Sequence, residues 1–323
     1  MTISLKQLRY FDAVARIGSF GAAADACAIT QPALSMQIQA LERYLGVQLL
    51  ERGRAGVLLT ECGRDVAQRA AKILGDVRDI VDVTRSQTDI PSGPLSLGVI
   101  PSVAPYLLPA LLPLAQDAYP DLDLHIRETQ THQLLHELAA GDLELLLLAL
   151  PVEPTDIEVE PLFEDRFLLA VPAERAVLKI AHATPELLQT DRLLLLEEGH
   201  CLRDQALAFC NLRQVGNINT FGASSLSTIA QMVVNGLGMT LLPELCLPLE
   251  NRNGEMHLIR FSDPEPQRTI GLAWRKSSPR KHHFLKLAET IRQAGERQLA
   301  LAHRIESSSI DRSRDYASVA SGS

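Results

Sequence analysis

The fold of the N-terminal region is decided by the stretch GSFGAAADACAITQPALSMQIQALERYLG, residues 18–46. Ser19 is placed to cap an Ala-rich helix, because serine is preferred at helix starts. Thr30 is placed to cap a second helix. Pro32 is tolerated in the first turn of that helix, because backbone N–H groups there have no hydrogen-bond partner within the helix. Gly46 ends that helix. Two short helices with a tight connection predict a helix-turn-helix.

The segments on either side extend this domain. Residues 1–17 carry Leu5, Leu8, Phe11 and Ala15 at helical spacing. Residues 52–59, RGRAGVLL, predict a small basic hairpin, or wing. We therefore expect a winged helix-turn-helix domain at residues 1–59.

A long helix is predicted next, over residues 61–88 with Thr60 as its cap. Its seam residues alternate at spacings of four and three, as in a coiled coil; they are Val66, Ala70, Ile73, Val77, Ile80 and Thr84. Such a stripe on a lone helix would face water, so we expect a partner helix from a second subunit. The expected linker helix covers residues 60–89, with Val66, Ile73, Val77 and Ile80 as dimerisation residues.

Beyond a Pro- and Gly-containing linker at residues 89–94, strands and helices alternate. This pattern predicts an α/β domain with largely parallel sheets at residues 90–304. The expected strands are residues 95–99, 122–127, 143–148, 166–171, 193–196, 217–221, 239–242, 256–261 and 269–274. The expected helices are residues 106–118, 132–140, 201–210, 226–235 and 282–302. Residues 305–323 are rich in Ser, Asp and Arg, and we expect a disordered tail.

Composition limits the function classes. The apolar run Leu143–Leu150 is far shorter than the roughly 20 residues of a transmembrane helix, and Met1–Tyr10 has no secretory pattern. We therefore expect a cytoplasmic protein without a membrane partner. Net charge is −8, but residues 1–88 hold 11 basic and 9 acidic side chains, whereas residues 89–323 hold 20 and 30. A slightly basic head on an acidic body is compatible with DNA binding and does not establish it.

The chain has five cysteines, without a CxxC motif or zinc-ligand spacing. We expect no metal and no cofactor. Cys27, Cys62 and Cys246 are interpreted as buried apolar residues.

Three residues begin the second helix of the helix-turn-helix, where side chains reach base edges in the major groove: Gln31, Pro32 and Ser35. A glutamine amide can read adenine, and serine can contact a base or a phosphate. Gln39, further along the helix, completes the expected DNA-binding set together with Arg52 and Arg54, which suit phosphate contacts. Spacing alone leaves an ordinary helical bundle as an alternative.

The first 60 or so residues resemble the head of LysR-type transcriptional regulators. The matching strings are LRYFDAVARIGSFGAAADACAITQPALSMQIQALERYLGVQLLER, residues 8–52, and LLTECG, residues 58–63. The resemblance extends over almost the whole chain. It implies a DNA-binding regulator with a linker helix and a two-lobed α/β effector domain like that of periplasmic binding proteins. One departure from the family pattern is Met36, because many members carry a basic residue at this position.

The same resemblance gives the expected lobes. The first would cover about 90–161 and 268–304, and the second about 162–267. Crossover strands near residues 159–163 and 268–274 would join them.

A second constellation surrounds Cys201, which is placed to open a helix. The positive end of a helix dipole lowers a thiol pKa, and Arg203 or protonated His200 would lower it further. The acidic pair Glu197 and Glu198 opposes this effect. An accessible thiolate can be oxidised by peroxide to sulfenic acid, which a second thiol captures as a disulfide.

The string GHCLRDQALAFC, residues 199–210, resembles the redox loop of the peroxide-sensing OxyR subfamily. That resemblance implies that Cys201 reacts with peroxide and that Cys210 resolves the product. It further implies a peroxide pocket with His200, Thr131, Ser102, Arg203 and Arg268. Ser102 stands where the subfamily typically has threonine, and Arg268 is equally compatible with a surface or hinge position.

The resemblance also implies partners. These are promoter DNA, hydrogen peroxide as signal, RNA polymerase, a glutaredoxin or thioredoxin as reductant, and a homodimer or homotetramer. We expect a regulator and not an enzyme. Two alternatives stay open: a LysR-type regulator of a small organic effector bound in the lobe cleft, with redox-inert cysteines, and a thiol peroxidase.

Overall fold

The computed structural model describes residues 2–53, 56–85, 89–153, 156–173, 182–189, 192–209, 218–219 and 223–320. The chain divides into two compact units, one built mainly from residues 1–87 and the other mainly from the rest. No helix in the described ranges is long and apolar enough to cross a membrane. Within them, no group of three His, Cys, Asp or Glu side chains is arranged to hold a metal ion.

The first unit contains the expected winged helix-turn-helix and linker helix. Its elements are α1 (Leu5–Ile17), α2 (Phe20–Ala26), α3 (Gln31–Leu45), β1 (Leu50–Gly53), β2 (Gly56–Leu59) and α4 (Glu61–Arg85). Ser19 caps α2 by accepting a hydrogen bond from the Ala22 N–H. Gly46 ends α3 in the left-handed conformation. Thr30 holds the cap position of α3 but makes no side-chain cap bond.

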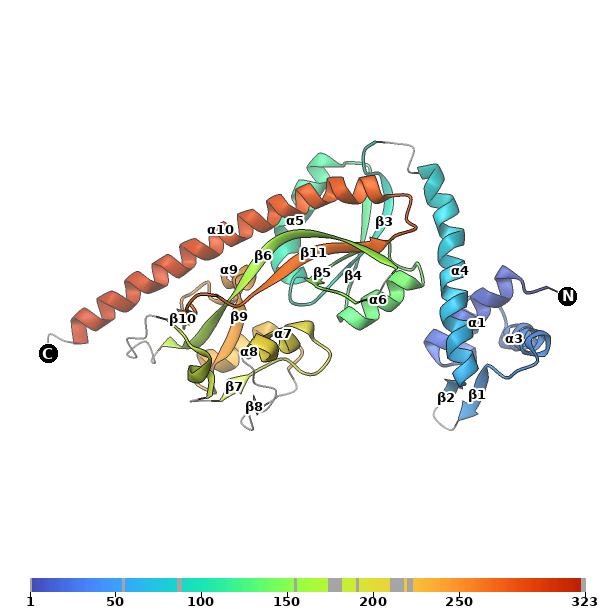
Figure 1. Cartoon of the computed structure of the whole chain (residues 1–323), viewed down its shortest axis with the longest axis horizontal. Helices are drawn as coiled ribbons and strands as arrows, with labels where there is room; N and C mark the ends of the chain where they lie inside the picture. Colours follow the sequence, from blue (N-terminus) through green and yellow to red (C-terminus); the bar gives the residue numbers. More distant parts are fainter. Residues whose placement is uncertain are drawn as a thin grey trace. The chain divides into compact units, whose positions relative to one another are not determined.

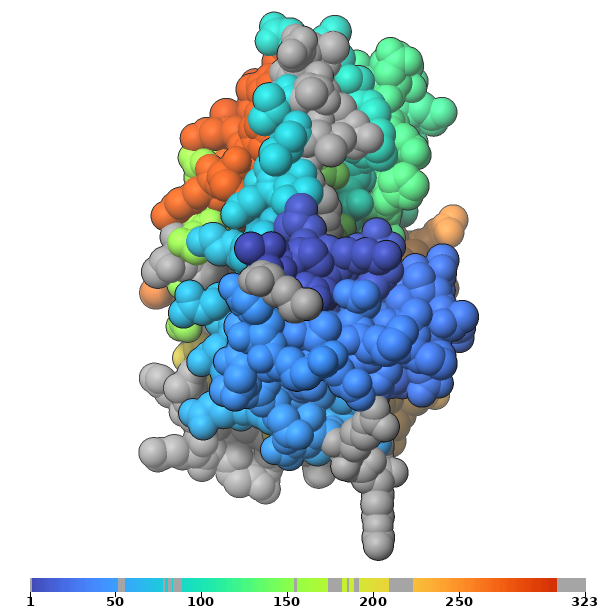
Figure 2. Space-filling model, turned by 90° about the vertical axis from the view of Figure 1, so that its right-hand side faces the viewer, coloured from blue at the N-terminus to red at the C-terminus, as the bar shows by residue number. Residues whose placement is uncertain are grey.

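Two apolar clusters hold the head together. One joins α1, α2 and α3 and includes Cys27, which is buried as expected. The other includes Phe11 and Leu41 and extends to Ala70 and Val66 of α4. Figure 2 shows one face of the head, in blue, as closely packed atoms. The first turns of α4 therefore belong to the core of the head.

The second unit is an α/β domain in two lobes. Its first-lobe elements are β3 (Gly93–Val99), α5 (Ala104–Ala118), β4 (Leu122–Glu128), α6 (Thr131–Ala139) and β5 (Leu145–Leu150). Its second-lobe elements are η2 (Pro185–Gln189), β7 (Leu193–Leu194), α7 (Cys201–Phe209), β8 (Ile218–Asn219), α8 (Leu226–Val234), β9 (Thr240–Pro243), η4 (Glu244–Cys246), α9 (Leu247–Glu250) and β10 (Met256–Ile259). Three elements extend along both lobes: β6 (Ile157–Pro172), β11 (Gln267–Arg275) and α10 (Lys281–Ala320).

The main sheet has the strand order β10-β6-β11-β5-β3-β4, and β9 also pairs with β6. The expectation of largely parallel sheets is wrong. Strand β3 is parallel to β4 and β5, but β11 is antiparallel to β5 and β6, and β6 is antiparallel to β9 and β10. Strand β11 lies between β5 and β6 and runs opposite to both, so it breaks the parallel arrangement in the middle of the sheet (Figure 1).

The C-terminal segment also differs from the expected disordered tail, because α10 continues to Ala320. Residues 305–320 are polar but contain neither proline nor glycine, the residues that most strongly disfavour helix. At its other end, α10 packs Phe284 against Trp274 of β11, with ring centroids 5.6 Å apart.

Candidate functional site

Cys201 is the first residue of α7 and carries a free, partly exposed thiol. It lines a pocket with an empty volume of about 190 Å³, part of which is open to solvent. The lining residues are Ile100, Pro101, Ser102, Gln130, Thr131, Gly199, His200, Cys201 and Leu202. Residues 100–102 follow β3, residues 130–131 span the start of α6, and residues 199–202 span the start of α7. The pocket is thus assembled from three distant segments of the chain.

Two polar atoms in this pocket are buried without a hydrogen-bond partner in the described part of the chain: Thr131 Oγ1 and His200 Nε2. Glu197 Oε1 lies 3.9 Å from His200 Nε2, beyond hydrogen-bond reach. Burial lowers the pKa of His200 below its usual value, and the Glu197 carboxylate opposes that shift. His200 is therefore neutral near pH 7, with one nitrogen able to donate and the other able to accept. The pocket offers polar atoms to a small polar molecule.

Ser102 is oriented by a buried ion pair. Arg268 Nη1 donates to Ser102 Oγ at 2.7 Å, and Arg268 Nη2 lies 2.8 Å from Asp165 Oδ2. Both charged side chains are fully buried. Burial raises the pKa of Asp165, and the Arg268 guanidinium opposes that rise. Because Ser102 Oγ accepts from Arg268, its own O–H is left to donate.

Arg268 and Arg203, both expected at the pocket, are not among its lining residues. Arg268 is 3% exposed and reaches the pocket through Ser102. Arg203 Nη1 donates to the Leu196 carbonyl at 3.0 Å and so ties α7 to the segment after β7. Cys210 lies outside the described residues.

Sequence reasoning missed the part of the pocket made by Gln130 and Gly199. Gly199 has φ +93°, and a Cβ atom there would lie 2.6 Å from Gln130 Oε1. A glycine directly before His200 and Cys201 was the available signal, because glycine is favoured where φ is positive.

In the head, Gln31, Pro32 and Gln39 are exposed on α3 and Ser35 is half-buried, so these side chains are accessible. Met36 is 62% exposed on the same helix. Arg54 lies outside the described residues, as does the side chain of Arg52.

Helix α4 carries one of the cysteines and all four of the expected dimerisation residues. Cys62, expected to be buried, is exposed in the first turn of α4. Ile73 and Ile80 are 43% and 67% exposed and Val77 is half-buried, whereas Val66 packs in the head.

Two family models match the chain. The model "Bacterial regulatory helix-turn-helix protein, lysR family" matches residues 5–64, and "LysR substrate binding domain" matches residues 88–296. The chain is 40% identical over 290 residues to the "DNA-binding transcriptional dual regulator OxyR" of Escherichia coli K12, covering 90% of this chain and 95% of the relative. It is 44% identical over 295 residues to a "Probable hydrogen peroxide-inducible genes activator" of Streptomyces viridosporus, covering 90% and 94%.

Solved structures of OxyR proteins are also similar to this chain. A full-length cysteine-to-aspartate OxyR variant from Pseudomonas aeruginosa matches with a TM-score of 0.73 and 36% identity, covering 90% of this chain and 95% of that one. An H2O2-bound cysteine-to-serine OxyR mutant from Corynebacterium glutamicum matches with a TM-score of 0.66 and 34% identity, covering 94% and 96%. The chain belongs to the LysR family of DNA-binding transcriptional regulators, within its OxyR branch.

Proposed function

We propose that this protein regulates transcription in response to hydrogen peroxide, which oxidises Cys201. The observation that carries the proposal is the pocket beside the free thiol, in which Thr131 Oγ1 and His200 Nε2 are buried without a partner among the described residues. Peroxide is small and has two O–H donors and two acceptor oxygens, so it can satisfy both atoms. Relatives named as peroxide-inducible activators and an H2O2-bound structural neighbour support the same signal.

The proposed chemistry begins with the Cys201 thiolate attacking one peroxide oxygen. The O–O bond breaks, sulfenic acid forms on Cys201, and the other oxygen leaves as hydroxide, which takes up a proton to become water. Thr131 and Ser102 hold the peroxide oxygens through their hydroxyl groups, and neutral His200 can donate to or accept from one of them. Pre-oriented donors at the leaving oxygen lower the barrier of such a step.

In the second step, the Cys210 thiol attacks the Cys201 sulfur and water leaves, which gives an intramolecular disulfide. Nine residues separate the two cysteines. In a continuous helix this corresponds to about 13.5 Å along the axis, whereas a disulfide needs Cα atoms within roughly 6.8 Å. Because α7 is helical from Cys201 to Phe209, closure requires α7 to unwind. Leu202 and Ala206, which are buried, would then leave their packed sites. This unwinding is the proposed switch.

Thiol trapping after a peroxide pulse tests the redox step. Cys201→Ser should abolish the response of promoter DNA binding to peroxide. Cys210→Ser should leave Cys201 oxidisable to sulfenic acid but unable to form the disulfide. The matched control is Cys62→Ser, because Cys62 is another exposed thiol. A Cys201→Ser protein that still responds to peroxide would refute the proposal.

The alternative of a small organic effector has weaker support. Pockets for such ligands usually have about 300–1,000 Å³, and the pocket at Cys201 is smaller. A thiol peroxidase would show sustained peroxide turnover, whereas a sensor needs a separate reductant, here a glutaredoxin or thioredoxin, to return to the thiol state.

We propose that the domains have the expected bounds: a DNA-binding head at residues 1–59, a linker helix at 60–89 and a sensor at 90–304. We further propose that the protein is a cytoplasmic homodimer or homotetramer that engages RNA polymerase.

Gln31→Ala should reduce operator discrimination by about 1–3 kcal/mol, the range for one bidentate base contact. Ile73→Asp should weaken dimerisation and DNA binding together, because it would place an unpaired charge in an apolar interface. Operator footprints and sedimentation at low protein concentration measure the two effects.

A further inference from the structure

Helix α10 extends beyond residue 296, where the match to the family domain ends. Its start is rooted in the first lobe: buried Arg280 donates through Nη1 to the Pro94 carbonyl and to Glu144 Oε1, both at 2.8 Å. Farther along, the Lys286 carbonyl accepts a hydrogen bond from the Tyr119 hydroxyl at 3.0 Å. The first half of α10 is thus fixed to the strands and helices of that lobe.

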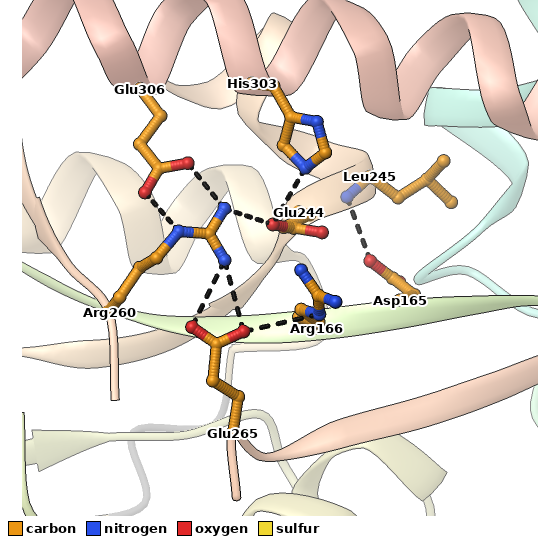
Figure 3. A network of polar contacts seen from close by, with 8 residues as sticks. All are labelled: Asp165, Arg166, Glu244, Leu245, Arg260, Glu265, His303 and Glu306. Carbon is orange, nitrogen blue, oxygen red and sulfur yellow. Dashed lines mark hydrogen bonds and ion pairs between the residues drawn. The ribbon is translucent and has the colours of Figure 1, made fainter. Parts of the chain in front are cut away.

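Residues 303–306, in the second half of α10, contact the second lobe (Figure 3). Arg260, next to β10, donates through Nε to Glu306 Oε1 at 2.5 Å and through Nη2 to Glu306 Oε2 at 2.6 Å. This two-pronged pairing is the strongest geometry between arginine and a carboxylate. His303 Nε2 lies 3.4 Å from Glu244 Oε1 of η4. The side chains of Glu306 and Arg260 are 10% and 25% exposed, so water screens the pair only in part.

The attachment point in the second lobe is next to the pair that orients the pocket. Arg260 Nη2 also donates to Glu244 Oε1 at 2.6 Å. The following residue, Leu245, donates its N–H to Asp165 Oδ1 at 3.0 Å, and Asp165 pairs with Arg268, which holds Ser102. The contacts of Arg260 and His303 with Glu244 hold η4 in place, and they therefore also support the Asp165–Arg268 pair.

We propose that residues 303–306 of α10 form a strap that fastens the second lobe to a helix rooted in the first lobe, and that the strap favours the thiol state of the sensor. In this structure Cys201 is free and α7 is an intact helix, so the strap is seen in the thiol arrangement. A contact made in one state and lost in the other biases the equilibrium toward the first. The direction of this bias rests on the disulfide switch proposed above.

Glu306 is the residue to change, because Arg260 is the shared partner of Glu244, Glu265 and Glu306 (Figure 3). Losing Arg260 would leave three neighbouring carboxylates without their common cation. Glu306→Ala removes one strap contact and keeps a good helix former. Glu296→Ala is the matched control, because Glu296 is exposed on the same helix.

The first measurement is the equilibrium of the full-length protein with glutathione. Two thiols, on Cys201 and Cys210, react with oxidised glutathione to give the intramolecular disulfide and two reduced glutathiones. Glu306→Ala should raise this equilibrium constant by about fivefold to tenfold, because water screens this partly exposed pair and lowers its contribution below that of a fully buried one. Glu306→Lys should raise it further, and Glu296→Ala should match the unsubstituted protein. Equal constants for all four proteins would overturn the proposal.

The second measurement uses no oxidant and separates failure of the strap from failure of the redox switch. In the reduced protein, amide hydrogen exchange in residues 243–259 should be about fivefold to tenfold faster in Glu306→Ala than in Glu296→Ala. If the unsubstituted protein forms no Cys201–Cys210 disulfide, the proposed switch fails and the bias of the strap toward the thiol state fails with it. Faster exchange would still support the fastening, whereas unchanged exchange in this segment would overturn it.

Discussion

The head and the Cys201 pocket are built in opposite ways. The head consists of consecutive elements whose caps and apolar spacings can be read in one continuous stretch, such as Ser19 before α2 and Gly46 after α3. The pocket brings together three separate segments, and its polar centre depends on the Asp165–Arg268 pair, whose members lie on β6 and β11. Local signals therefore define the head, whereas tertiary packing defines the site. Substitutions should expose this difference.

The largest effect is expected at Arg268. Arg268→Met would remove the partner of fully buried Asp165 and the donor to Ser102. Breaking a buried ion pair on one side typically costs about 3–5 kcal/mol. Chemical denaturation should show a loss of this order in the free energy of unfolding, together with slower oxidation of Cys201.

The double variant Arg268→Met with Asp165→Asn is the control, since it also removes the uncompensated carboxylate. It should recover part of the stability but not the oxidation rate, because Ser102 still lacks its donor. If the double variant is as unstable as Arg268→Met, the uncompensated charge is not the cause.

The next effect lies at the junction of head and linker. In α4, a Cβ atom on Gly63 would lie 2.0 Å from the Leu49 carbonyl oxygen. Backbone cannot move aside as a side chain can, so Gly63→Ala should cost about 2–3 kcal/mol of unfolding free energy. Gly46→Ala is the comparison: φ is +71° with nothing within 4 Å, so only the backbone strain of about 1–2 kcal/mol applies. Equal losses would mean that α4 shifts away from Leu49 at little cost.

The head and the Cys201 pocket also show how far the sequence could predict the structure. Helix caps and apolar spacing predicted the helices of the head and most strands of the sensor to within a few residues. The sequence could not show that β6 and β11 run antiparallel through both lobes, because strand direction depends on connections and not on local pattern. It named Cys201, His200, Thr131 and Ser102 for the pocket through family resemblance. The indirect role of Arg268 became visible only in three dimensions.

A smaller effect should separate crowding from backbone strain within the sensor. Gly199 and Gly236 both have positive φ, +93° and +78°, but only Gly199 has a side chain, Gln130, in the path of an added Cβ. Both alanine variants should lose about 1–2 kcal/mol from strain. Gly199→Ala should in addition slow the oxidation of Cys201 by peroxide, because Gln130 must move within the pocket. Equal oxidation rates in the two variants would remove Gln130 from the account of the site.

The smallest effect concerns the protonation of His200. Burial holds the pKa of His200 below its usual value of 6.5 in the folded protein. At higher pH His200 is neutral in both the folded and the unfolded chain, so it contributes nothing to the pH dependence of stability. As the pH falls below about 6.5, the unfolded chain takes up a proton that the folded chain does not, and unfolding becomes more favourable.

The slope from one such group is at most about 1.4 kcal/mol per pH unit. Subtracting the stability curve of His200→Asn from that of the unsubstituted protein isolates it, because His257, whose pKa is also lowered by burial, contributes to both. The difference should be flat above pH 7 and should fall from about pH 6.5 downward. A difference that rises on acidification would mean that His200 is stabilised as the cation by Glu197, and the pocket would then hold a charged donor in place of a neutral one. The two outcomes give His200 different roles toward peroxide. A protonated His200 can only donate to the peroxide oxygens, whereas neutral His200 can also accept a proton from peroxide.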